Sequence, residues 1–236
     1  MFIDPLYFIM LIPAMLLAGW AQAKVKNAYA QAQKYRASSG MSGAEAAQRI
    51  LDTHGLARVA IERARGFLGD HYDPRQRVLR LSPGVYDGRN LAAVGIAAHE
   101  VGHAIQHANG YAPLSLRNAI VPLAATGSQL SMAVFVGGWI MSIMGMLSFG
   151  KTLMIGGVFL FGAVVLFQLI NLPVEFDASK RARQVLVSSG VITATEDGPV
   201  AKVLNAAAMT YVAATISAIL TLVYLIIRSG LLGNRN

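Results

Sequence analysis

The sequence predicts an α-helical membrane protein with about four transmembrane helices and a small α+β domain. Hydrophobic residues make up 55% of the 236 residues and charged residues only 14%, a balance that is unusual for a soluble protein. Four stretches contain no Lys, Arg, Asp or Glu, and each has the roughly 20 residues that a helix needs to cross a bilayer. Between the first two stretches lies a charged segment with the helix and strand patterns of a folded domain.

The four uncharged stretches run from Pro5 to Ala23, Asn118 to Gly150, Thr152 to Val174 and Val203 to Ile227. We expect spanning helices near 5–23, 125–149, 152–172 and 206–227. The second and third should form a hairpin with a short turn around Lys151. Both are rich in glycine, which lets membrane helices approach closely. The hairpin could pack against its own helices or against a second copy of the chain, so a homo-oligomer stays open.

The first stretch could instead be a cleaved signal peptide, because Ala21-Gln22-Ala23 has the small-x-small form of a cleavage site. A signal peptide begins with positive charge, whereas Met1 to Asp4 carries an acid and no base. We therefore expect the first stretch to remain as a spanning helix.

The distribution of basic residues predicts the orientation in the membrane. Segment 24–117 holds 13 of the 20 Lys and Arg residues, and segment 174–202 holds four more. The positive-inside rule places both on the cytoplasmic side of a multi-pass protein of the cell (inner) membrane. The formal charge of +8 fits contact with anionic lipid, and we expect no nucleic acid partner. The chain has no cysteine, which excludes thiol catalysis and thiolate metal sites.

Local signals divide the charged segment into short elements. Ser42-Gly43-Ala44-Glu45 has capping-box spacing and predicts a helix that stops at Gly55. Two strands should follow, near 57–64 and 77–82, the second ending at the breaker Pro83-Gly84. Asp87 or Asn90 can then cap a helix that runs to His107, with Asn109-Gly110 as its end signal.

That last helix carries a metal-binding pattern, His99-Glu100-Val101-Gly102-His103. Residues four apart lie on one helix face, so His99 and His103 can bind a single ion, and neutral imidazole suits zinc. Glu100 lies about 100° around the helix, where it can reach a zinc-activated water and act as general base. With five His and five Glu residues, chance would produce this pattern in only about 0.002 of such chains.

A hydrolytic zinc site needs a third protein ligand. His107 would stand about 12 Å along the helix axis from His99, which is too far for one tetrahedral ion. Glu175 is the best candidate, because an acid where a membrane helix emerges is functional by default and an even number of spans puts it on the side of His99. An interfacial acid paired with Lys180 or Arg183 is the structural alternative. Asp177, on another face, could orient a ligand histidine.

Two segments together resemble the YugP-type membrane zinc metallopeptidases. They are His99-Glu100-Val101-Gly102-His103-Ala104-Ile105-Gln106-His107 and Leu172-Pro173-Val174-Glu175-Phe176-Asp177-Ala178-Ser179. The resemblance covers most of the chain, including the span before the domain and the helical hairpin. It implies a gluzincin-like site in a zincin-like catalytic domain, and a distant similarity to the membrane heat-shock metalloproteases. Those proteases carry an Asp four residues after the ligand glutamate, where this chain has Ser179.

Carried over residue by residue, the resemblance implies one zinc ion per chain on His99, His103 and Glu175, with Glu100 as the base. It also implies that the strand near 77–82 is an edge strand that binds a peptide or protein substrate by strand addition. The tetrahedral oxyanion needs a stabiliser, for which the sequence offers several candidates without choosing among them. They are Tyr111, His107, Arg181 and Arg183.

The domain boundaries that we expect follow from these elements. They are a first transmembrane helix at 1–23, a zincin-like cytoplasmic domain at 24–118, a transmembrane hairpin at 119–172, a cytoplasmic segment with the third ligand at 173–205, and a last transmembrane helix with its tail at 206–236.

The predicted function is that of a membrane-embedded zinc endopeptidase, with membrane-protein quality control as one role. An intramembrane, site-2-type protease is an alternative, but Arg89 and Arg117 bracket the motif helix and no Gly follows Asp177. The other alternative is a non-enzymatic scaffold or transporter with a structural zinc site, although such sites normally have four protein ligands.

Overall fold

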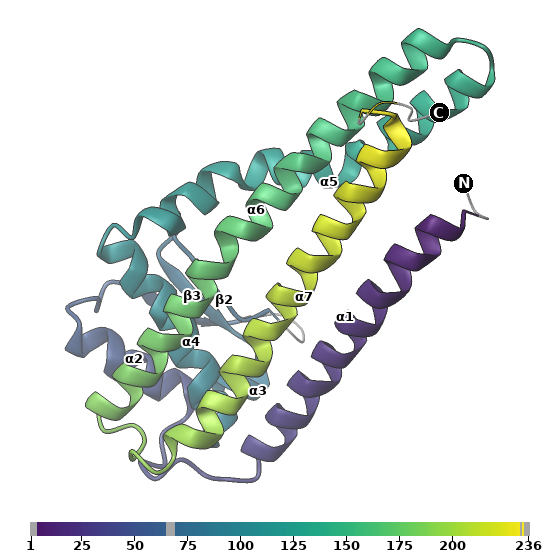
Figure 1. Cartoon of the computed structure of the whole chain (residues 1–236). Helices are drawn as coiled ribbons and strands as arrows, with labels where there is room; N and C mark the ends of the chain where they lie inside the picture. Colours follow the sequence, from purple (N-terminus) through teal and green to yellow (C-terminus); the bar gives the residue numbers. More distant parts are fainter. Residues whose placement is uncertain (1–3, 65–68, 232, 234–236) are drawn as a thin grey trace. The chain divides into compact units, whose positions relative to one another are not determined.

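The computed structural model describes residues 4–64, 69–231 and 233, and these residues are mostly helical with one small sheet (Figure 1). Contacts divide the described residues into two compact units. The first unit comprises Met1–Trp20, Leu116–Leu172 and Thr210–Asn236, and the second comprises Ala21–Ser115 and Pro173–Met209. Each unit is described by itself below.

Within the described residues, four helices are long and apolar enough to cross a membrane, the number that the sequence predicted. They are α1 (Pro5–Ala32), α5 (Ala112–Ile143), α6 (Leu147–Ser188) and α7 (Asp197–Ser229). Each is longer than the span expected from the sequence, because the helices continue beyond their uncharged stretches. In particular, α6 passes through Pro173 without a break.

The turn between α5 and α6 was misplaced by the sequence prediction. It lies at residues 144–146 and not around Lys151, which is inside α6. Gly145 adopts a φ of 90°, and Met146 N–H bonds back to the carbonyl oxygen of Met141. A left-handed glycine therefore ends α5. The lysine does not mark the turn because a long charged side chain can be exposed from within a helix.

Glycines bring α5 and α6 together within the first unit. A Cβ added at Gly138 would lie 2.5 Å from the carbonyl oxygen of Gly150, and one at Gly157 would lie 2.8 Å from that of Ser131. Such contacts between backbones are possible only for small residues. The two helices of the hairpin therefore pack against each other, which is one of the two arrangements that the sequence left open.

In the same unit, polar groups join the start of α1 to the end of α7. Asp4 accepts hydrogen bonds from the Tyr224 hydroxyl and pairs with Arg228, both at 3.1 Å. The ring of Tyr7 also packs edge-on against Tyr224, with centroids 5.3 Å apart. The first stretch is thus an integral part of this unit.

The second unit contains the predicted capped helix, α2 (Gly43–Thr53). Ser42 Oγ accepts from Glu45 N–H, and the Glu45 carboxylate accepts from Ser42 N–H, so the capping box is complete. Gly55 follows with a φ of 69°. Both end signals identified in the sequence are confirmed.

The sheet has three strands in the order β1-β3-β2, one more strand than the sequence predicted. Strand β1 (Ala60–Arg63) runs parallel to β3 (Val78–Leu81), and β2 (His71–Asp73) runs antiparallel to it. The prediction that the strand near 77–82 is an edge strand is therefore wrong, because β3 is flanked on both sides. β2 was missed because three residues show no measurable alternation.

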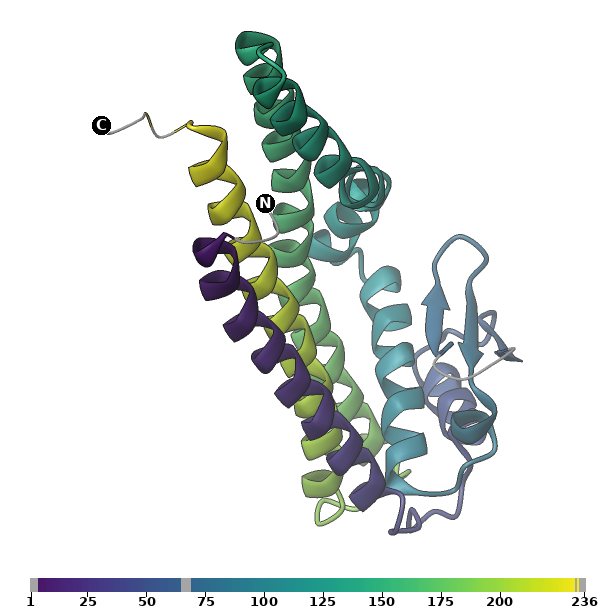
Figure 2. The ribbon, with the colours of Figure 1, turned by 90° about the vertical axis from the view of Figure 1, so that its right-hand side faces the viewer.

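A short helix, α3 (Pro83–Tyr86), replaces the simple break expected at Pro83. The motif helix α4 (Leu91–Ala108) follows, capped by the Asn90 side chain, which accepts from Ala93 N–H at 3.0 Å. Gly110, with a φ of 61°, comes directly after its C-cap. Figure 2 shows α4 packed beside the hairpin of β2 and β3.

Two glycines let α4 approach its neighbours in the second unit. A Cβ at Gly102 would lie 2.6 Å from the carbonyl oxygen of Ala178 on α6, and one at Gly95 would lie 3.1 Å from Val200 on α7. Gly102 stands between the two motif histidines, so its close contact brings α6 directly against the metal-binding face of α4.

Candidate metal centre

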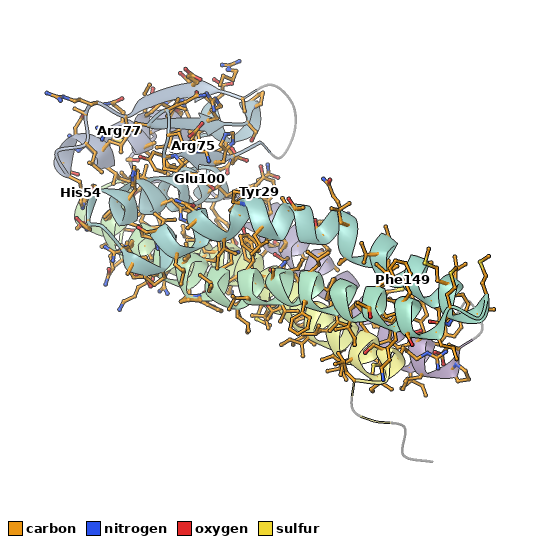
Figure 3. All side chains as sticks on the ribbon, turned by 90° about the horizontal axis from the view of Figure 1, so that it is seen from above. Tyr29, His54, Arg75, Arg77, Glu100 and Phe149 are labelled. Atoms are coloured by element: carbon orange, nitrogen blue, oxygen red, sulfur yellow. The ribbon has the colours of Figure 1, made fainter. Side chains whose placement is uncertain are left out.

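The two histidines of the motif lie on one face of α4, as their spacing predicts. Their rings meet edge to face, with centroids 4.8 Å apart. His103 is buried and His99 is partly buried, in a setting of alanine and valine side chains from α4. Figure 3 shows Glu100, from the same helix, in the part of the second unit where the sheet covers α4.

Glu175 on α6 reaches both histidines. Its Oε2 lies 3.2 Å from His99 Nε2, and its Oε1 lies 3.7 Å from His103 Nε2. Ligand atoms of all three residues lie within 4.8 Å of one another. Residues 76 positions apart in the chain thus form one group, as expected from the choice of Glu175 as the third ligand candidate.

The donor set fits zinc. Zinc bonds to imidazole nitrogen and carboxylate oxygen are each about 2.1 Å long, so tetrahedral geometry separates two donor atoms by about 3.4 Å. The separations of the two histidine nitrogens from the Glu175 carboxylate, 3.2 Å to Oε2 and 3.7 Å to Oε1, lie on either side of that value. Two histidines and one carboxylate also leave a fourth position for water, as hydrolytic zinc sites require.

The other ring nitrogen of each histidine has its own polar partner. Ser179 Oγ lies 3.1 Å from His99 Nδ1, and Gln106 Oε1 lies 2.9 Å from His103 Nδ1. Partners of this kind hold the rings of metal-binding histidines in orientation. Ser179, four residues after Glu175, therefore contacts His99, one of the two candidate ligand histidines.

Glu100 is 8% exposed and has no hydrogen-bond partner described here, although it lies one residue from His99. Burial raises the pKa of its carboxyl to about 6, while His99 opposes the shift and the negative charge of Glu175 adds to it. A carboxyl group in this environment is able to exchange protons near neutral pH.

Asp177 does not contact a ligand histidine directly. Its Oδ2 accepts from Gln106 Nε2 at 2.8 Å and from Arg181 Nε at 2.5 Å. The guanidinium of Arg181 in turn lies over the ring of Tyr111, 5.7 Å from its centroid. The expected link from Asp177 to a histidine thus runs through Gln106, a residue that we did not identify from the sequence.

The remaining candidates, His107 and Arg183, each have a partner on another element. His107 Nδ1 is 2.9 Å from the hydroxyl of Tyr72 on β2, which places the pair between the motif helix and the sheet. Arg183 forms a salt bridge of 2.5 Å with Asp197 at the start of α7, so the charge of Arg183 is balanced there. None of the described contacts selects an oxyanion stabiliser among these residues.

The architecture and the site are those of a membrane protein in which two histidines and a glutamate form a group that could hold a metal ion. A family model described as "putative neutral zinc metallopeptidase" matches residues 7–230, so the chain belongs to that family. The family description implies zinc as the metal.

One relative is the "putative membrane protease YugP" of Bacillus subtilis (strain 168). It is 47% identical over 211 residues, which cover 89% of this chain and 91% of the relative. The predicted resemblance to this family is thereby confirmed. No solved structure gives a significant match to the chain.

Proposed function

We propose that the protein is a membrane-embedded zinc endopeptidase in which His99, His103 and Glu175 hold the metal and Glu100 is the general base. The observation that supports this proposal most strongly is the convergence of one carboxylate from α6 on the Nε2 atoms of both motif histidines. The family and the relative agree with it in their descriptions.

The division of roles follows from the positions of the side chains. Zinc, when bound, would supply a Lewis acid that lowers the pKa of a coordinated water and polarises the scissile carbonyl. Glu100, the neighbour of one ligand on the same helix, would take a proton from the attacking water at a carboxylate oxygen. It would then pass that proton to the leaving amine nitrogen.

The substrate of such an enzyme is a peptide or protein segment in extended form. Among the described strands, β2 lies at one edge of the sheet and contacts α4 through Tyr72 and His107. We propose that substrate pairs with the open edge of β2, where its scissile bond would run along the motif helix. Methylating single backbone amides of a peptide substrate should raise KM at every second position, because alternate amides face the strand. A uniform effect along the peptide would exclude this binding mode.

The motif helix α4 is not among the helices that are long and apolar enough to cross a membrane, in the part of the chain that the structure describes. This favours a site outside the bilayer over the intramembrane type of protease. From the basic residues of the second unit we further propose that the site faces the cytoplasm, where quality control of membrane proteins is a suitable role.

The experiment that tests this function compares zinc content and peptide hydrolysis of the purified protein in detergent for the wild type and for Glu100→Gln. The proposal expects the variant to keep its zinc and to lose hydrolysis by about 100-fold or more, as for removal of a general base. Glu62→Gln, an exposed glutamate on β1, is the matched control. Full activity in Glu100→Gln would exclude Glu100 as the general base, whereas zinc binding without any hydrolysis in the wild type would favour a structural zinc site.

A further inference from the structure

Gln106 is completely buried, and all of its polar atoms have partners in the second unit. The amide nitrogen Nε2 donates to the carbonyl oxygen of Val174 and to Oδ2 of Asp177, both at 2.8 Å. The amide oxygen Oε1 lies 2.9 Å from His103 Nδ1. Gln106 thus contacts His103, a candidate metal ligand. It also contacts Val174 and Asp177, which lie one position before and two positions after Glu175.

These partners fix which way the amide faces. A backbone carbonyl is an acceptor only, so the NH₂ group of Gln106 must point toward the carbonyl oxygen of Val174. The same NH₂ group reaches Oδ2 of Asp177, which also forms a salt bridge with Arg181. The opposite orientation would place the amide oxygen against two acceptors in a buried site, at a high cost in free energy.

The orientation of the amide in turn fixes the proton on His103. Because Oε1 can only accept, the Nδ1 atom that faces it must carry a hydrogen. The Nε2 atom, which faces the Glu175 carboxylate at 3.7 Å, is then the nitrogen that is left to bind a metal ion.

From this chain of contacts we propose that Gln106 is a positioning residue for zinc, selecting the metal-binding tautomer of His103 and locking the register of α6 that presents Glu175. This inference rests on the proposed function as far as zinc is concerned. The tautomer itself is a property of the metal-free protein and can be observed without zinc.

The first experiment is nitrogen-15 NMR of the histidine rings in metal-free protein at pH 8. In the wild type we expect His103 to carry a proton on Nδ1. In Gln106→Leu we expect this proton to be lost from Nδ1, because no acceptor holds it there. Gln48→Leu, on the exposed face of α2, is the control. A wild-type His103 without a proton on Nδ1, or unchanged protonation of Nδ1 in Gln106→Leu, would overturn the proposal.

The second experiment measures zinc affinity by competition with a chelator, and the visible spectrum of the Co²⁺-loaded protein. Gln106→Glu has nearly the same shape but places a carboxylate against Val174 and Asp177. We expect its zinc affinity to fall by about 10- to 100-fold, because repulsion from the Val174 carbonyl and the Asp177 carboxylate moves the side chain away from His103. Co²⁺ in Gln106→Glu should also show a changed d–d band.

The double variant Gln106→Glu/Asp177→Asn should recover part of the affinity, because the new amide can donate to the new carboxylate. A zinc affinity of Gln106→Glu equal to that of the wild type, or the absence of any recovery in the double variant, would contradict the proposal. If the wild type itself bound no zinc, the proposed function would fail, whereas the tautomer of His103 would still test the role of Gln106.

Discussion

Ser179 Oγ lies 3.1 Å from Nδ1 of His99, on the opposite side of the imidazole from the nitrogen that faces Glu175. Ser179 and Glu175 are one helical turn apart on α6, so a single helix holds both nitrogens of the ring. The contact gives the ligand histidine a partner of the kind that metal sites use to fix ring orientation.

Replacing this hydroxyl should weaken the metal site without destroying it. For Ser179→Ala we expect zinc affinity to fall by about 10-fold, the lower end of the range for partners of ligand histidines, because serine is a neutral partner. The measurement is chelator competition, with Ser188→Ala near the end of α6 as the control. Unchanged affinity in Ser179→Ala would show that the hydroxyl does not orient His99.

Gly102 tests the close contact between α4 and α6. In Gly102→Ala the new methyl group would lie 2.6 Å from the carbonyl oxygen of Ala178, so the two helices must separate. We expect a loss of stability of about 1–3 kcal/mol, as for other overpacked sites, together with loss of zinc as Glu175 moves from the histidines.

Thermal unfolding and zinc content measure both effects. Gly198→Ala is the matched control, because a Cβ there meets nothing within 4 Å and alanine favours a helix. Normal zinc binding in Gly102→Ala would mean that the close approach is not needed for the site.

The pH dependence of stability should include a contribution from Glu196 in the second unit. Its carboxylate accepts hydrogen bonds from Ser38 and Thr193, each through backbone N–H and hydroxyl. Burial alone would raise the pKa of Glu196, but these bonds outweigh it and lower the pKa. The stabilisation is therefore present above the ordinary carboxyl pKa and is lost as pH falls through the lowered value.

Glu196→Gln should accordingly reduce the melting temperature of metal-free protein by roughly 2–4 °C at pH 7, which corresponds to about 1 kcal/mol. The difference from the wild type should shrink as pH falls below the ordinary carboxyl pKa, because the carboxylate of the unfolded chain is protonated there before that of the native protein. Melting curves in detergent between pH 7 and pH 3 measure it. A difference that stays constant over this range would contradict the assigned contacts.

The sequence predicted the parts of the structure that depend on local signals. The capping box at Ser42, the Asn90 cap and the glycine after α4 each act within a few residues, and all three are present. The His99 and His103 spacing predicted their common face for the same reason. Local reasoning failed at β2 because a strand of three residues is too short to show a pattern. It failed at the turn near Gly145 because the charge of Lys151 was taken to mark the turn.

The surroundings of the metal centre depend on contacts between distant segments. Gln106 looks in sequence like one more polar residue of a helix, since nothing nearby shows that Val174 and Asp177 will meet it. The same holds for the contact of Ser179 with His99. A polar residue three positions after a ligand histidine, in an otherwise apolar helix, was the signal that could have identified Gln106.

The central claim is that α4 and α6 together form a zinc site, with Glu175 as its third ligand. The most direct test is the zinc content of purified Glu175→Ala after dialysis against a weak chelator, beside the wild type and the exposed control Glu62→Ala. The account predicts one zinc ion per chain in the wild type and the control, and little or none in Glu175→Ala. A full complement of zinc in Glu175→Ala would contradict it.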